Sequence, residues 1–211
     1  RYTLGANDWL MGDERTNGAI RSMSNPNIYS QPDTYLGTYW YTGSGDNGGV
    51  HYNSGVQNFW FYLLSNGGTG TNDNGDSYAV VGLTMSTAEN IAAQTLQFYL
   101  GATDEYADAR DKSIQAAIDI YGACSNQVRQ VTNAWHAVGV GDAYPEASAT
   151  VADPVVCSGE TIQLYSSGGV SYLWSGPAGF STSTQNPSRT NALTTYSGIY
   201  TVTVTFSDGC T

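Results

Sequence analysis

Positive charge is scarce in this chain, which has seven lysines and arginines together against 18 aspartates and glutamates. The resulting net charge of −11 would repel nucleic acid and anionic membranes, so neither is an expected partner. Long apolar runs are also lacking, and none approaches the roughly 20 residues that a membrane span needs. An acidic, Gly- and Tyr-rich composition is typical of an exported protein, so we expect a secreted or cell-surface location.

Cysteine and histidine are rare as well. The three cysteines, Cys124, Cys157 and Cys210, lack the CxxC spacing of a zinc ribbon or a thioredoxin-like site. Cys157 and Cys210 lie in one downstream segment, so we expect that they can form a disulfide in an oxidising compartment. Of the two histidines, His136 falls inside a helical pattern and is expected to be structural, which leaves His51 as the candidate for chemistry.

The character of the sequence changes between residues 141 and 150. Before this point, a loop-rich stretch of about 50 residues precedes four amphipathic patterns, typical of a compact helical bundle. The expected helices cover residues 56–66, 86–100, 104–121 and 125–138. Residues 69–77 are rich in Gly, Asn and Asp, and are expected to form a surface loop. The fold class is therefore multidomain, α then β, with a helical domain at residues 1–143.

The second expected domain, residues 144–211, alternates short strand patterns with turns. Strands are predicted at residues 160–166, 171–174 and 198–206. Trp174 fits the core tryptophan of an immunoglobulin-like sandwich, and Tyr196–Tyr200 fits its tyrosine corner. The sequence stops where a final strand is expected, so we expect an incomplete Ig-like β-sandwich.

Residues 46–55 (DNGGVHYNSG) form the most informative stretch. His51 follows Asp46 by five residues, with a glycine pair between them, and an apolar stripe of helical spacing comes next. A loop thus delivers both side chains to the start of a buried helix, which suits a histidine held by a carboxylate. Two other interpretations remain open: His51 as a hydrogen-bonded structural residue, and Asp46 as a simple helix cap.

Four segments carry a resemblance to a known family: residues 7–12 (NDWLMG), 20–26 (IRSMSNP), 46–55 and 134–140 (AWHAVGV). In this order they resemble the C-terminal subdomain of thermolysin-like zinc metallopeptidases, over about Asn7 to Val140. The resemblance implies that His51 donates a hydrogen bond to the oxyanion of a tetrahedral intermediate and that Asp46 accepts from its other ring nitrogen.

The same resemblance assigns a substrate-binding wall. Arg21 would bind a carbonyl of the peptide or protein substrate, since its planar fork suits an oxygen acceptor better than lysine does. Met11 and Ile20 would line an apolar pocket for the residue after the scissile bond. Without the resemblance, an internal salt-bridge partner is the slightly preferred interpretation of Arg21.

Two metals are implied. In the family, Zn²⁺ is held by two histidines of an HExxH helix and a later glutamate, and this chain contains no HExxH. The zinc ligands are therefore expected before Arg1, in an N-terminal catalytic subdomain, and this chain should be inactive alone. One Ca²⁺ site is expected from Asp8, Asp13 and the Leu10 carbonyl, shared with upstream residues.

The sequence thus predicts the C-terminal part of a secreted zinc metalloendopeptidase. The alternative is a non-catalytic, surface-binding or adhesive fragment of a larger exported protein. Residues 175–180 and 207–210 resemble repeat modules of Bacteroidetes surface and secreted proteins, which occur on enzymes and on adhesins alike.

Overall fold

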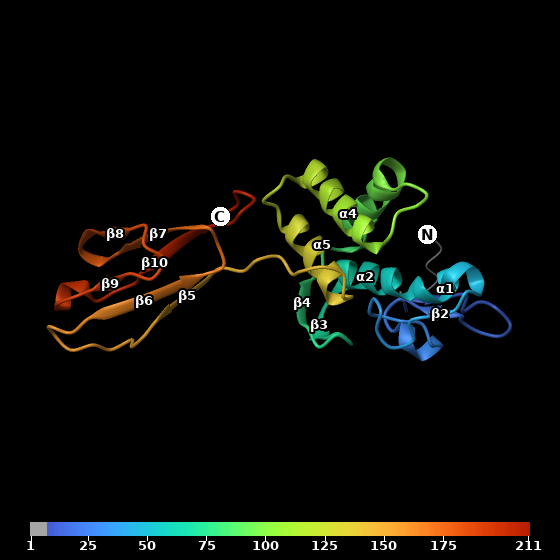
Figure 1. Cartoon of the computed structure of the whole chain (residues 1–211), viewed down its shortest axis with the longest axis horizontal. Helices are drawn as coiled ribbons and strands as arrows, with labels where there is room; N and C mark the ends of the chain where they lie inside the picture. Colours follow the sequence, from blue (N-terminus) through green and yellow to red (C-terminus); the bar gives the residue numbers. More distant parts are fainter. Residues whose placement is uncertain (1–7) are drawn as a thin grey trace. The chain divides into compact units, whose positions relative to one another are not determined.

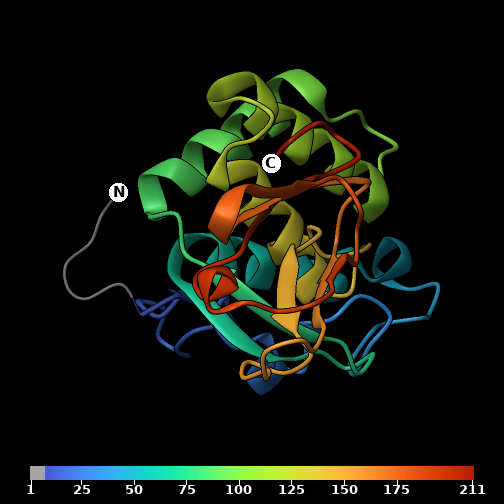
Figure 2. The same ribbon diagram turned by 90° about the vertical axis from the view of Figure 1, so that its left-hand side faces the viewer.

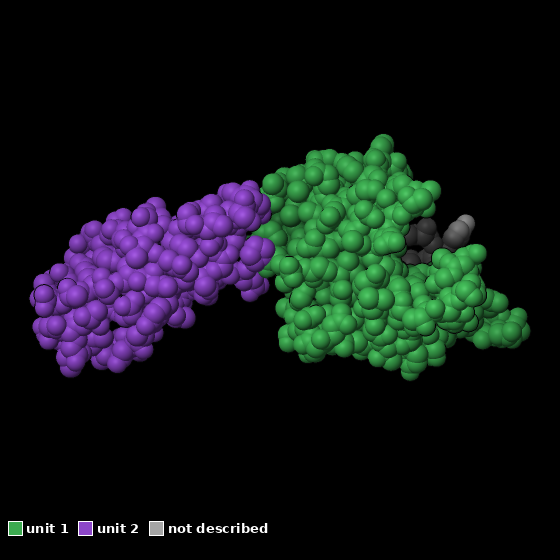
Figure 3. All heavy atoms as spheres, viewed as in Figure 1, with its two compact units in different colours: residues 1–144 green, residues 145–211 purple. Residues whose placement is uncertain are grey.

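The computed structural model describes residues 8–211. The chain divides into two compact units, residues 1–144 and 145–211 (Figure 3). Within residues 8–211, no helix combines the length and the apolar character needed to cross a bilayer. Each unit has its own buried side chains and is described separately below.

Unit 1 contains the four predicted helices, which are therefore confirmed (Figure 1). They are α2 (Gly55–Asn66), α3 (Met85–Gln94), α4 (Tyr106–Tyr121) and α5 (Asn126–Ala137). A π-helical turn, Thr95–Tyr99, extends α3. Gly67 and Gly122 end α2 and α4 with φ angles of 78° and 89°, a conformation that favours glycine.

The core of unit 1 is built from the apolar faces of these helices. Trp60 of α2 and Trp135 of α5 stack with ring centroids 4.7 Å apart, and both are almost fully buried. The Trp135 indole N–H donates to Ser113 Oγ of α4 at 2.7 Å, so its polar atom is satisfied inside the core. These contacts join helices α2, α4 and α5.

A hairpin follows α2 directly: β3 (Gly67–Thr71) pairs antiparallel with β4 (Ser77–Val81) and packs against α5 and α2 (Figures 1 and 2). The surface loop predicted for residues 69–77 is thus wrong at both ends, and only the turn between the strands is irregular. Asn72 organises that turn, because its Oδ1 accepts from the N–H groups of Asn74 and Asp76 at 3.1 and 3.0 Å.

The N-terminal part of unit 1 has little regular structure, as predicted. Strands β1 (Leu10–Met11) and β2 (Arg21–Ser22) form a two-residue antiparallel ladder that places Met11 opposite Arg21. A 3-10 turn, η1 (Pro26–Tyr29), comes next, and α1 (Asp46–Asn53) leads into α2.

Unit 2 consists of short strands: β5 (Ser148–Val151), β6 (Ile162–Ser167), β7 (Ser171–Gly176), β8 (Phe180–Thr182), β9 (Ser188–Arg189) and β10 (Thr201–Thr205). They form two antiparallel sheets with strand orders β5-β6-β9 and β10-β7-β8. Trp174 is buried in the core, and Tyr200 Oη donates to the Tyr196 carbonyl at 3.0 Å. The Ig-like assignment stays a prediction.

The predicted disulfide between Cys157 and Cys210 is wrong, because Cys157 is a free, exposed cysteine. Cys157 lies in an open turn, where its N–H donates to Glu160 Oε2 at 2.7 Å. Cys210 is buried, only 4% exposed, in the turn after β10. Location in the same unit was therefore not sufficient evidence for a disulfide between these two cysteines.

Candidate functional site

His51 is delivered by a run of left-handed backbone. Asp46, Asn47, Gly48 and Gly49 have φ angles of 52°, 50°, 83° and 86°. Such a run favours glycine and asparagine, which explains the Asn-Gly-Gly sequence. Although α1 is assigned from Asp46, regular helical geometry begins only at Val50. His51 therefore stands in the first turn of a short helix.

Asp46 binds His51 in two places. Its Oδ2 accepts the His51 main-chain N–H at 2.9 Å, and its Oδ1 lies 2.5 Å from the ring Nδ1. The hydrogen bond from the His51 ring, followed by that from its main chain, holds the pKa of the Asp46 carboxyl below its ordinary value. One carboxylate thus contacts both the main chain and the ring of His51, so the helix-cap and histidine-holding interpretations of Asp46 are compatible.

The carbonyl of His51 is also held. It accepts from Arg21 Nη2 and Gln31 Nε2, each at 3.2 Å, and from Ser54 Oγ at 3.4 Å. Within residues 8–211, the Nε2 atom of His51 has no hydrogen-bond partner, and the side chain is 71% exposed. Among the described residues, every polar group of His51 except Nε2 is thus held by a hydrogen bond, on a side chain that is largely exposed.

The predicted substrate-binding residues lie together on the β1–β2 ladder. Ile20 N–H donates to the Met11 carbonyl at 2.9 Å, and Met11 pairs with Arg21 across the ladder. Met11 and Ile20 are 39% and 48% exposed, which leaves their apolar side chains accessible. Among residues 8–211, Arg21 donates to the His51 carbonyl and has no carboxylate at ion-pair distance, although its charge helps to lower the pKa of the Asp46 carboxyl.

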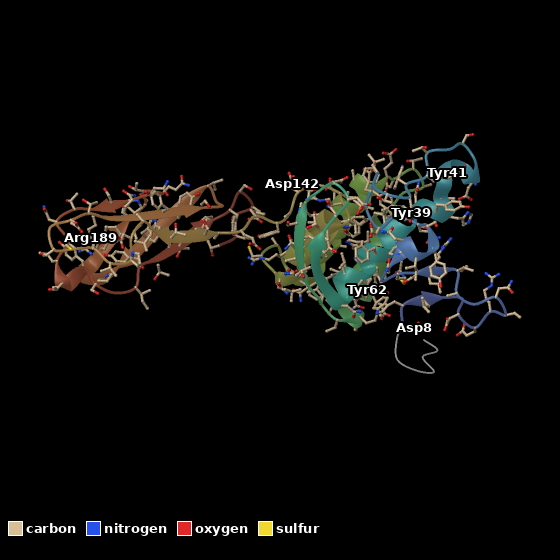
Figure 4. All side chains as sticks on the ribbon, turned by 90° about the horizontal axis from the view of Figure 1, so that it is seen from below. Asp8, Tyr39, Tyr41, Tyr62, Asp142 and Arg189 are labelled. Carbon is tan, nitrogen blue, oxygen red and sulfur yellow. The ribbon has the colours of Figure 1, made fainter. Side chains whose placement is uncertain are left out.

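Tyr41 supports the His51 loop from one side (Figure 4). Its N–H donates to Asn53 Oδ1 at 2.9 Å, and Asn53 Nδ2 donates back to the Tyr41 carbonyl at 3.1 Å. The Tyr41 ring stacks on Tyr52 and fills the space above Gly49, where an added Cβ would lie 2.5 Å from Tyr41 Cδ1. The glycine is therefore required by contact as well as by its φ angle.

The predicted calcium ligands lie in and beside strand β1. Asp8 Oδ1 accepts the Leu10 N–H at 3.0 Å, while Asp13 is exposed in the connection between β1 and β2. No group of three His, Cys, Asp or Glu side chains able to hold a metal ion occurs among residues 8–211. The described residues therefore do not fit a zinc centre. The calcium site stays a prediction.

Sequence comparisons identify related proteins. Residues 2–140 match the family described as thermolysin metallopeptidase, alpha-helical domain. Relatives include a bacillolysin of Bacillus caldolyticus and a thermolysin of Alicyclobacillus acidocaldarius subsp. acidocaldarius, each 41% identical over 138 residues, and a bacillolysin of Brevibacillus brevis, 42% identical over the same length.

The aligned stretch covers 63% of this chain but only 24% or 25% of each relative, so the chain spans about a quarter of their length. The match contains the His51 loop, Arg21 and helices α1 to α5. This chain belongs to the thermolysin family of metallopeptidases through the family's alpha-helical domain.

Proposed function

We propose that this chain is the C-terminal part of a secreted zinc metalloendopeptidase and forms one wall of its substrate cleft. The other wall, an N-terminal catalytic subdomain, would carry the zinc ion, because residues 8–211 contain no fitting ligand group. The chain would then be inactive alone. Below, the parent protein means this chain joined to that zinc-binding part.

The way His51 is held carries this proposal. The ionised Asp46 carboxylate accepts a hydrogen bond from the Nδ1–H group of His51. A neutral His51 therefore carries its ring proton on Nδ1, and Nε2 can donate only when the ring is in the imidazolium form. A fixed donor aimed outward stabilises negative charge that develops on a substrate oxygen, as in an oxyanion hole.

Arg21 and the β1–β2 ladder would bind the substrate. One guanidinium nitrogen of Arg21 is used on the His51 carbonyl, which places the rest of the fork beside the catalytic residue. Met11 and Ile20 would then line the pocket for an apolar side chain after the scissile bond. Asp8, Asp13 and the Leu10 carbonyl would contribute to one Ca²⁺ site, completed by residues before Arg1.

Arg21→Lys in the parent protein tests the substrate-binding role. The variant keeps the charge but loses the planar fork, so kcat/KM for a peptide substrate should fall by about tenfold or more. Arg15→Lys is the matched control, since Arg15 is exposed in the β1–β2 connection. Equal kcat/KM values for both variants would remove Arg21 from the site.

A groove in unit 2 favours the alternative, a binding role. It has a volume of about 890 Å³ and lies over the core, with Trp174, Ile162 and Tyr200 among its lining residues. Val155 at its rim is 80% exposed. The sequence of the parent protein distinguishes the two functions. An HExxH motif with a later glutamate supports the peptidase, and a degenerate zinc motif supports binding alone.

A further inference from the structure

Gln31 is a buried polar residue that the proposed chemistry does not yet use. It is 7% exposed, and its Nε2 donates to the His51 carbonyl at 3.2 Å, across 20 residues of sequence. Its other polar atom, Oε1, is buried without a hydrogen-bond partner. One end of the amide is thus used on the candidate catalytic residue, and the other is left unsatisfied.

The approach of Gln31 to this position depends on Gly55, the first residue of α2. A Cβ at Gly55 would lie 2.4 Å from the Pro32 carbonyl oxygen and 3.0 Å from Gln31 Cβ. The glycine therefore allows the Gln31–Pro32 segment to pack directly against the helix start. This packing fixes the stem of Gln31 and aims its amide nitrogen at His51.

Stability alone does not explain an amide at this position. A buried, unpaired oxygen is unfavourable, and an apolar side chain of similar size, such as methionine, would fill the space without it. What glutamine adds is a donor to the His51 carbonyl. That donor shares the carbonyl with Arg21, so the position of His51 does not rest on Arg21 alone.

We propose that Gln31 is a positioning residue for His51. Gln31 holds the carbonyl of His51, while Asp46 holds its main-chain N–H and its ring. Together these hydrogen bonds fix the position of Nε2. The consequence for catalysis rests on the proposed function of His51, but the consequence for its geometry does not.

Gln31→Met in the 211-residue chain tests the geometry. Imidazole signals are easily assigned by NMR, because His51 and His136 are the two histidines of the sequence. The His51 ring and main-chain signals should shift or broaden, those of His136 should not, and the melting temperature should stay the same or rise. Gln97→Met, at an exposed site, is the matched control. Unchanged His51 signals in Gln31→Met would overturn the proposal.

The same variant in the parent protein tests the consequence. A displaced donor should lower kcat by about 10- to 100-fold and leave KM nearly unchanged. A rise in KM, which means weaker substrate binding, with an unchanged kcat would overturn the positioning role in catalysis. If the NMR signals of His51 move and kcat stays the same, the geometry of the proposal is supported and the catalytic function proposed for His51 fails.

Discussion

Asp46 serves His51 twice, through the main-chain N–H and through the ring. This double contact was partly predictable, since five residues and a glycine pair bring the two side chains within reach. The role of Gln31 was not, because its contact spans 20 residues and no local pattern marks it. Residue-level prediction therefore succeeded where partners are close in sequence and failed where packing brings them together.

His51→Ala should raise the pKa of the Asp46 carboxyl toward its ordinary value of 3.8, because it removes the hydrogen bond of the His51 ring, which is the largest cause of the lowering, and keeps only the main-chain bond. The carboxyl ¹³C shift of Asp46, followed against pH, measures this change. Asp104 is the control, since Lys112 lowers its pKa independently. An Asp46 midpoint equal to that of the unmodified chain would contradict the pairing.

The sign of the linked stability follows from this direction. A lowered native pKa means that the Asp46 contact is at full strength above the ordinary pKa of aspartate and is lost as pH falls through the lowered value. The difference in unfolding free energy between the unmodified chain and Asp46→Asn should therefore shrink on acidification.

Among the elements, helices were predicted well and the β3–β4 hairpin was missed. The apolar stripe of α2 repeats with helical spacing, so its local sequence is sufficient. Strand β3 has the sequence GGTGT, in which two β-branched threonines are outnumbered by three glycines, a residue that is depleted in strands. It forms because β4 and α2 lie beside it, and that context is tertiary.

The His51 loop offers a matched pair of glycines. Gly48 and Gly49 have nearly equal φ angles, 83° and 86°, but a Cβ at Gly48 meets nothing within 4 Å. Gly49→Ala should therefore destabilise the chain by about 1–3 kcal/mol more than Gly48→Ala, through its clash with Tyr41. Urea unfolding measures both. Equal losses would mean that Tyr41 does not support the loop.

At the scale of the whole molecule, the family and the change from a helical unit to a unit of strands were predictable, whereas the cysteine pairing was not. Motif order carried the family assignment, which the match over residues 2–140 confirms. The free Cys157 shows the limit of predicting disulfides from sequence. A disulfide needs a specific distance between two sulfurs, and spacing in sequence does not supply that distance.

The isolated 211-residue chain should bind no stoichiometric zinc and should not cleave casein. The reason is the lack of a three-ligand group among residues 8–211. Metal analysis after dialysis, together with a casein assay at neutral pH, measures both properties. One zinc per chain accompanied by casein cleavage would contradict the division into two walls.

The central claim is that His51 stabilises charge in the transition state. Its most direct test is the kcat of the parent protein on a peptide substrate, with His51→Ala compared with His136→Ala. His136 contacts the Gly141 carbonyl in unit 1 and serves as the control for losing a histidine. We predict that His51→Ala lowers kcat by about 10²–10³-fold while His136→Ala leaves it nearly unchanged. Equal kcat in the two variants would contradict the account.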